Sequence, residues 1–297
     1  MEKTPRRYIG KFDAHNVAIG VDFQHGDGVP KNIDKEEHSH DFTELIVIHG
    51  GHGVHRVDQR DYGISAGNVF VVKGYQTHSY RQRHDLYYAT VKFQPRMLSL
   101  PEDQLKKLPG YNALFLVEPS RRNRSRCQDF MKLAPEQLEK LMTLIRQLDH
   151  EVEGEFPGYE SMAQSLLVQI MVYLSREYVN SDEESAQAML RVGKVIGLLE
   201  QEYAKEWQLE ALCRIADMSK SNLLVVFREV TGMTPIEYLI DIRLRQAMHL
   251  LERNDATITE IAYKVGFTDS NYFARQFRKE IGASPSEYRK IHARAAV

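Results

Sequence analysis

Hydrophobic and polar positions follow different periods in the two parts of the chain. Between residues 8 and 95, the runs Phe42–Ile48, Val69–Val72 and Asp85–Phe93 are rich in β-branched and aromatic residues and are separated by glycines. This composition predicts strands, and the His-Gly-Gly-His-Gly sequence at 49–53 predicts a turn. Many short strands without alternating helices favour a barrel or a sandwich over a βαβ fold.

From Pro135 onward the apolar residues recur every three or four positions, which predicts helices. One helix is expected from Pro135 to the break at Gly154–Gly158, and a second helix follows the break. Their apolar stripes consist of Leu138, Leu141, Met142, Ile145, Leu148 and Val152, and of Met162, Leu166, Ile170 and Tyr173. Packing against the barrel explains these stripes, and so does pairing of two subunits through helices at about 135–177, which would make a homodimer.

The chain length indicates two domains, because 297 residues are about twice the size of a typical domain. A polar, unpatterned stretch follows the second helix. We therefore expect an N-terminal domain over 1–180, a linker at 181–189 and a C-terminal domain over 190–297. The charged fraction of 27% is ordinary for a soluble globular protein, and no apolar run is long enough to span a membrane. With no secretory signal pattern and two cysteines, a cytoplasmic location is expected.

Charge is distributed unevenly between these domains. The net charge of −2 excludes a uniformly basic nucleic-acid-binding protein. Residues 190–297, however, hold 16 Lys and Arg against 14 Asp and Glu, whereas the rest of the chain holds 23 against 27. A mildly basic domain joined to an acidic one is consistent with a nucleic-acid reader coupled to a sensor.

A repeat occurs within residues 190–297. Each copy predicts a short amphipathic helix, a tight turn, a second helix after a capping residue (Ser219 or Asp269), and a glycine stop. The matching positions are Leu209, Leu212, Cys213, Ala216 and Met218 with Ile258, Ile261, Ala262, Val265 and Phe267, followed by Phe227, Gly232, Pro235 and Tyr238 with Phe277, Gly282, Pro285 and Tyr288. Two helices joined in this way form a helix-turn-helix, whose second helix can enter the major groove of DNA.

The segment Ile258–Arg289 matches a known signature almost throughout, including Gly266-Phe267, Ser270-Asn-Tyr-Phe273 and Gly282-Ala-Ser-Pro285. Residues 190–297 thereby resemble the C-terminal DNA-binding domain of the AraC/XylS family of bacterial transcription regulators. With the strand pattern, this resemblance implies an α+β two-domain fold. A cupin-like β-barrel with appended helices would precede an all-α domain of two helix-turn-helix units.

The resemblance places the DNA-contacting residues on the second helix of each unit. Arginine can bind guanine through O6 and N7, and asparagine can pair with adenine. The first unit departs from the family pattern at Leu224 and Val225, so we expect it to read DNA more weakly and to tolerate A·T pairs. Tyr272, Phe273 and Phe277 are expected to face the core. The candidate DNA-binding residues are Lys220, Ser221, Asn222, Leu224, Val225, Arg228, Asp269, Ser270, Asn271, Arg275 and Arg278.

The N-terminal half holds four side chains of the metal-ligand type, His38, His40, Glu44 and His78. Alternating His38 and His40 would point to the same face of a strand, and Glu44 lies an even number of residues further along. Imidazole and carboxylate suit Fe, Mn, Ni, Cu or Zn, and the spacing resembles the metal-ligand positions of the two cupin motifs. His49, His52 and His55 are predicted to lie at the surface or the rim.

Three interpretations of the four side chains remain open. They bind a divalent metal in a working cupin enzyme, they hydrogen-bond a polar effector, or they are structural. Regulators of the arabinose type carry a cupin-like domain that binds a small effector, usually without metal, so we favour an effector pocket and expect no obligatory cofactor.

The resemblance implies a DNA-binding regulator rather than an enzyme. We expect an activator that responds to a small polar effector such as a sugar and that acts with promoter DNA and RNA polymerase. Within the family, His40-Asp-Phe-Thr-Glu-Leu45 and Leu148-Asp-His-Glu151 look most like the L-rhamnose regulators. The alternative function is a metal-dependent cupin enzyme fused to a DNA-binding module.

Overall fold

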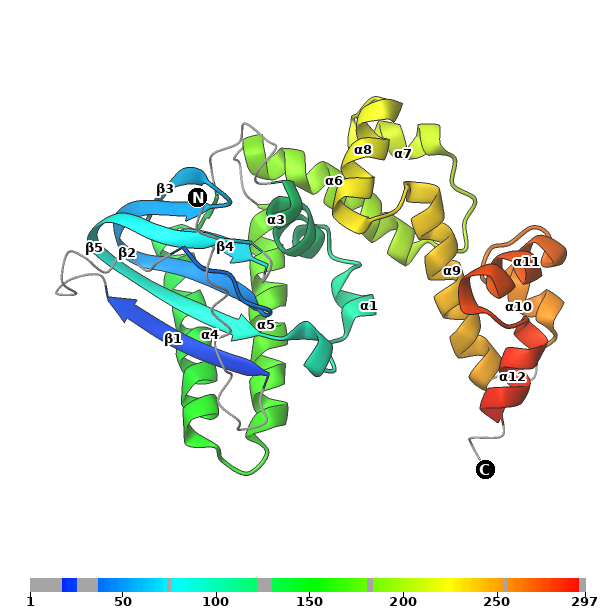
Figure 1. Cartoon of the computed structure of the whole chain (residues 1–297), viewed down its shortest axis with the longest axis horizontal. Coiled ribbons are helices and arrows are strands. Elements are labelled where there is room, and N and C mark those ends of the chain that lie inside the picture. Colours follow the sequence, from blue (N-terminus) through cyan, green and yellow to red (C-terminus); the bar gives the residue numbers. More distant parts are fainter. Residues whose placement is uncertain are drawn as a thin grey trace, which may run out of the picture. The chain divides into compact units, whose positions relative to one another are not determined.

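The computed structural model describes residues 18–25, 37–73, 76–121, 130–180, 184–253 and 256–293. They fall into two compact units, one up to Gly193 and one from Lys194 onward (Figure 1). The first unit is a β-sheet with helices and the second is entirely helical where it is described. The predicted two-domain fold class is confirmed.

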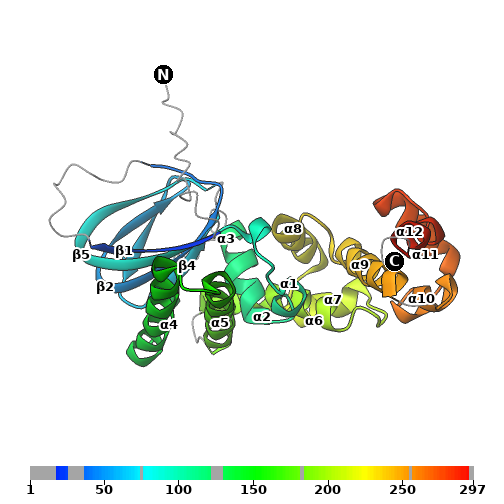
Figure 2. The same ribbon diagram turned by 90° about the horizontal axis from the view of Figure 1, so that it is seen from below.

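The first unit contains an antiparallel sheet. Its strand order is β1-β5-β2-β4-β6, and β3 is paired to β2. Figure 2 shows how strongly its strands curve. Apolar side chains fill the inside of the curve, among them Ile46, Phe70 and Tyr88. The strands are β1 (Ile19–His25), β2 (Thr43–Val57), β3 (Arg60–Ser65), β4 (Asn68–Val72), β5 (His78–Phe93) and β6 (Met131–Lys132).

The turn predicted at 49–53 is wrong, because these residues lie inside the long strand β2. Its pairing with β5 shifts register between Ile48 and Val54, as in a series of β-bulges. Gly51 has a φ of +66°, and a Cβ placed there would lie 1.8 Å from the carbonyl oxygen of Asp85 on β5. Glycine-rich sequences serve both turns and bulges, and here they bend a continuous strand.

Two long helices, α4 (Pro135–Gly154) and α5 (Tyr159–Val179), run side by side, and α4 packs on β1 (Figures 1 and 2). Most residues of both predicted stripes are buried within this one chain, although Met162 is 51% exposed. Intrachain packing therefore accounts for most of the stripes. No helix in the described ranges is both long and apolar enough to cross a membrane.

Beyond β5, residues 95–121 are largely helical, although no element was predicted for them. This segment contains η1 (Pro95–Met97), α1 (Glu102–Leu105), α2 (Pro109–Tyr111), the π-helical turn η2 (Asn112–Val117) and α3 (Glu118–Arg121). Short elements of this kind are held by tertiary contacts, since isolated helices of one turn are not stable.

The linker expected at 181–189 differs from the structure. Helix α6 (Glu184–Gln201) already includes residues 184–189, and the boundary between the units falls later, between Gly193 and Lys194. Met189 and Leu190 are buried in this helix. Residues 181–183 lie outside the described part.

The second unit contains the predicted repeat as the helix pairs α7 (Leu209–Ala216) with α8 (Lys220–Thr231) and α10 (Ile258–Lys264) with α11 (Ser270–Ile281). The second helices begin after Ser219 and Asp269, whose side chains accept hydrogen bonds from backbone N–H groups of the first turn. They end at glycines with positive φ, as predicted.

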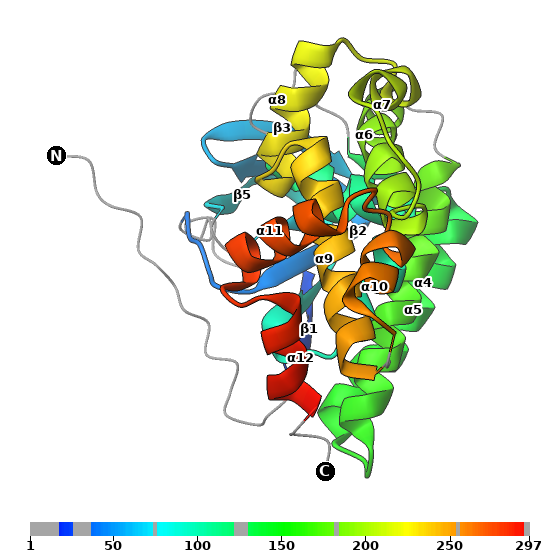
Figure 3. The same cartoon turned by 90° about the vertical axis from the view of Figure 1, so that its right-hand side faces the viewer.

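Helix α9 (Pro235–Arg253) connects the two helix pairs, and α12 (Pro285–Ala293) follows the second pair (Figure 3). The ring of Tyr238, near the start of α9, packs edge-on against Phe227 of α8. Leu244 and Leu251, further along α9, belong to the core that holds Phe273 and Phe277. One helix therefore contributes to both cores, which fixes the spacing of the two pairs.

The close approach at Gly51 generates a stability prediction. Gly51→Ala should lower the free energy of unfolding. The strained backbone alone would cost about 1–3 kcal/mol, and the clash with the Asp85 carbonyl adds to this cost. The matched control is Gly63→Ala on β3, where a Cβ meets nothing within 4 Å. That change should be neutral or slightly stabilising. Urea unfolding followed by circular dichroism measures both, and equal effects would contradict the bulge explanation.

Candidate functional site

The outward faces of α8 and α11 carry most of the predicted DNA-binding residues. Asn271, Arg275 and Arg278 are exposed on α11, and Ser270 is half-buried. On α8 the side chain of Leu224 is half-buried rather than fully outward. The remaining α8 candidates are exposed, namely Lys220, Ser221, Asn222, Val225 and Arg228.

Tyr272 was predicted to face the core, and this is wrong, because its side chain is 38% exposed. The guanidinium carbon of Arg275 lies 5.9 Å from the centre of the Tyr272 ring, within the range of a cation–π interaction. Tyr272 therefore stands on the outward face beside Arg275. The repeat contained this signal, because the matching position in the first copy is the polar residue Asn222.

Several polar candidates already have intramolecular partners. The carboxylate of Asp269 accepts a hydrogen bond from the backbone N–H of Asn271 at 2.7 Å, so its structural role is that of an N-cap. Lys220 lies 3.5 Å from Glu210, and Arg228 lies 3.4 Å from Glu237. These exposed ion pairs are weak, and DNA phosphates can compete for both cations.

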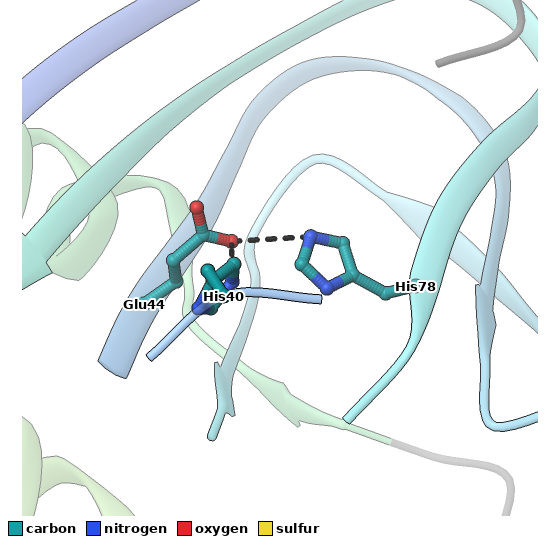
Figure 4. Close-up of side chains that lie close together, drawn as sticks. All are labelled: His40, Glu44 and His78. Carbon is teal, nitrogen blue, oxygen red and sulfur yellow. Dashed lines mark ion pairs between the residues drawn. The ribbon is translucent and has the colours of Figure 1, made fainter. Parts of the chain in front are cut away.

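In the first unit, His40, Glu44 and His78 converge inside the curved sheet (Figure 4). One carboxylate oxygen of Glu44, Oε2, lies 3.3 Å from His40 Nε2 and 3.2 Å from His78 Nε2. All three side chains are buried. Since β5 residue His78 pairs with Val57 at the far end of β2 from Glu44, the bend of the strands is what brings them together.

Burial is the largest single influence on Glu44 and by itself would raise the pKa of its carboxyl group. Hydrogen bonds and charge interactions with His40 and His78 together outweigh burial, and they hold this pKa well below the ordinary value of 4.5. Glu44 is therefore a buried carboxylate that is ionised at neutral pH. Such a group needs positively polarised partners, which the two imidazoles supply.

His38, the fourth predicted ligand, lies beside this group. His38 and His78 exchange backbone hydrogen bonds of 3.1 and 2.9 Å, and their ring centres are 4.3 Å apart. Within the described ranges, the cluster whose ligand atoms all lie within 4.8 Å of one another consists of His40, Glu44 and His78. The structure thus brings three of the four predicted residues into one cluster, with the fourth adjacent.

His55 was predicted to lie at the surface or the rim, and it is instead fully buried, at 0% exposure. Its ring packs 4.7 Å from Tyr80 and 5.7 Å from His78. The error follows from the missing turn, because β2 continues and carries His55 back into the interior. His49 is half-buried and His52 is exposed, consistent with the prediction for these two.

Tyr80 is a polar residue of the interior that the sequence analysis missed. Its hydroxyl is buried and has no hydrogen-bond partner among the described residues. Burial, with smaller effects from Tyr88 and Glu44, raises the pKa of Tyr80 well above its usual value, so the hydroxyl stays protonated. Alternation along β5 contained the signal, because residues 78 and 80 share one face of the strand.

A buried polar cluster in a β-sheet unit, joined to a double helix-turn-helix, defines a class of protein: a ligand-responsive, DNA-binding transcription regulator. Comparison with known proteins agrees. Residues 30–171 match the AraC-like ligand binding domain, and residues 212–291 match a helix-turn-helix domain.

Two curated relatives cover nearly the whole chain. The HTH-type transcriptional activator RhaR of Escherichia coli K12 is 32% identical over 260 residues, which are 86% of this chain and 88% of that protein. RhaR of Salmonella schwarzengrund is 30% identical over 256 residues, or 86% and 87% of the two chains. The crystal structure of the DNA-binding domain of AdpA in complex with a target DNA is 32% identical, covers 34% of this chain and 92% of that chain, and has a TM-score of 0.33.

The chain belongs to the AraC family of transcription regulators. This family is not enzymatic, so the alternative of a metal-dependent cupin enzyme is set aside. The chain is a DNA-binding regulator with a ligand-binding domain.

The cap at Asp269 generates a second prediction. Asp269→Ala should lower the free energy of unfolding by about 0.5–2 kcal/mol, because an N–H of the first turn of α11 loses its acceptor. Asp269→Asn keeps an equivalent cap and is the matched control. Thermal unfolding of the full chain measures both, and an equal loss in the Asn variant would show that charge rather than capping stabilises α11.

Proposed function

We propose that this chain activates transcription from promoter DNA when a small polar effector, a sugar or a sugar acid, binds inside its curved sheet. The observation that carries the proposal is the buried Glu44 carboxyl group held between His40 and His78 in the interior of a regulator's ligand-binding domain. The relatives named as activators support the sign of regulation.

The interior offers what a hydroxyl-rich ligand needs. A carboxylate accepts hydrogen bonds from hydroxyl groups, and imidazole and phenol groups donate or accept them. Beside these polar groups lie the rings of Phe70 and Tyr88, which provide apolar surface. Few polar groups set in an apolar lining are typical of small-molecule sites. The proposed effector contacts are therefore His40, Glu44 and His78, with His38 next to them.

Regulation requires that the effector bind one arrangement of the protein better than another. The proposal includes pairing of two copies, because two linked DNA-binding domains bind a two-part site more tightly than one. Phe156, between α4 and α5, and Met162 on α5 are exposed apolar residues that such a dimer would cover. As an activator, the DNA-bound dimer would contact RNA polymerase.

The two helix-turn-helix units are proposed to divide the reading of DNA. Arg275 on α11 and Val225 on α8 occupy matching positions, and both side chains are exposed. Arginine can form two parallel hydrogen bonds to guanine, whereas valine can only contact a thymine methyl group. We therefore assign most base reading to the second unit, with Asn271 and Tyr272 beside Arg275.

Substituting the matched pair tests this division. Arg275→Ala should cost about 1–3 kcal/mol on the cognate site and should relax preference at one base position. Val225→Ala should reduce affinity only for sites with thymine at its contact, with an unchanged salt dependence, because an apolar side chain releases no counterions. Competition binding against a site library at two salt concentrations measures both. An Arg275→Ala variant with intact base preference would show that the wrong helix face was chosen.

Substituting Glu44 tests the sensor. Glu44→Gln should abolish effector-dependent transcription and leave effector-independent DNA binding nearly unchanged, because Glu44 lies in the other compact unit. A promoter reporter and a thermal-shift screen over monosaccharides and sugar acids, beginning with L-rhamnose, provide the two readouts.

The control for this experiment is Glu139→Gln, at an exposed position of α4. It should behave as wild type in both assays. A Glu44→Gln variant that still responds to its effector would remove the cluster from the proposed site.

A further inference from the structure

We propose that His40, Glu44 and His78 together bind one divalent transition-metal ion. The inference deepens the proposed function, because it places a cation among the proposed effector contacts. Binding of the ion can nevertheless be tested whether or not the proposed function is correct. It departs from the family expectation of an effector site without metal.

The separations of the ligand atoms fit one shared ion. Metal–nitrogen and metal–oxygen bonds of about 2.0–2.2 Å, meeting at angles between octahedral and tetrahedral values, separate neighbouring ligand atoms by about 3.0–3.4 Å. The two observed separations from Glu44 Oε2 are 3.2 and 3.3 Å, and the three ligand atoms all lie within 4.8 Å. Both imidazoles therefore lie at the separation from Glu44 Oε2 that a shared ion requires.

The hydrogen bonding of His40 supports a cation more directly. His40 Nδ1 lies 2.8 Å from the carbonyl oxygen of Phe42, which can only accept a hydrogen bond, so Nδ1 carries the proton. The other ring nitrogen, Nε2, is therefore the one that faces Glu44 Oε2, at 3.3 Å, and that an ion would meet.

The hydrogen bond between His40 Nδ1 and the Phe42 carbonyl oxygen also orients the imidazole ring. Histidines that bind metal through one ring nitrogen usually donate the other N–H to a carbonyl or carboxylate, which fixes the orientation of the ring. His40 has this arrangement, and its ring also stacks on Phe42 at a centroid distance of 4.0 Å. The position of Nε2 is therefore held from two sides before any ion arrives.

The donor set defines the class of ion. Two imidazoles and one carboxylate favour Zn²⁺, Fe²⁺, Mn²⁺, Co²⁺ or Ni²⁺, whereas Mg²⁺ and Ca²⁺ prefer oxygen ligands. Three protein ligands leave coordination positions for water or for an oxygen of the effector. The role proposed for the ion is to orient an effector oxygen, with no reaction at the site.

Direct titration with Co²⁺ tests the proposal, because its visible absorption reports the coordination. The full chain, treated with a chelator and dialysed, should bind one equivalent of Co²⁺ with visible absorption bands, and Zn²⁺ should displace it. His40→Ala and His78→Ala should each weaken binding by more than the 10–100-fold that loss of an outer-shell partner causes. Calorimetry with Zn²⁺ gives the affinities, and circular dichroism with promoter binding verifies that the variants fold.

His52→Ala and His84→Ala are the matched controls. These exposed histidines stack at 4.8 Å on the same strands and are the obvious alternative place for an added ion. Both variants should bind Co²⁺ as wild type does.

Two results would overturn the metal site. One is loss of the bound Co²⁺ in the His52→Ala or His84→Ala variant. The other is equal Co²⁺ binding by wild type and the His40→Ala, His78→Ala double variant. Absence of Co²⁺ binding together with an intact sugar response would likewise overturn the ion and leave the proposed function standing. Co²⁺ bound at the cluster in a chain that no sugar activates would support the ion and refute the function.

Discussion

The first unit depends on one close backbone contact, where β2 meets β5 at Gly51 and Asp85. A side chain at residue 51 would collide with the Asp85 carbonyl, so glycine is required for the two long strands to approach there. The register shifts at this point are those of β-bulges, which bend the strand that contains them. Without the bend, His78 would remain at the opposite end of the ladder from Glu44, and the interior would hold no polar cluster.

The cluster of His40, Glu44 and His78 is not expected to stabilise the fold. Burying a carboxylate is costly, and replacement of a buried ion pair by apolar groups of similar volume is often neutral or stabilising. Apolar side chains such as Ile46 and Phe70 form a core cluster on the same strands. The buried carboxyl group faces two imidazoles there, which is the geometry on which the proposed effector and cation sites rest.

The second unit contains the same helix-pair scaffold twice, with different side chains on the two outward faces. Caps, glycine stops and aromatic anchors are the same in both helix pairs, because the folding of each pair requires them. Arg275 and Val225 occupy equivalent exposed positions of the two helix pairs but differ in charge and in hydrogen-bonding capacity. The core constrains the frame, and the outward positions are available for specificity.

The sequence alone determined the features that depend on local periodicity and capping. The helix pairs, the caps at Ser219 and Asp269 and most of the exposed face of α11 were all predictable, because a 3.6-residue period and a cap act over a few neighbouring residues. His40, Glu44 and His78 could be picked out as candidate ligands by residue type and spacing. Tertiary structure alone decided that 49–53 bends a strand instead of ending it, that His55 and Tyr80 point into the interior, and that residues 184–189 are helical. These outcomes depend on contacts between residues far apart in sequence, such as Gly51 with Asp85, and local patterns carry no information about such contacts.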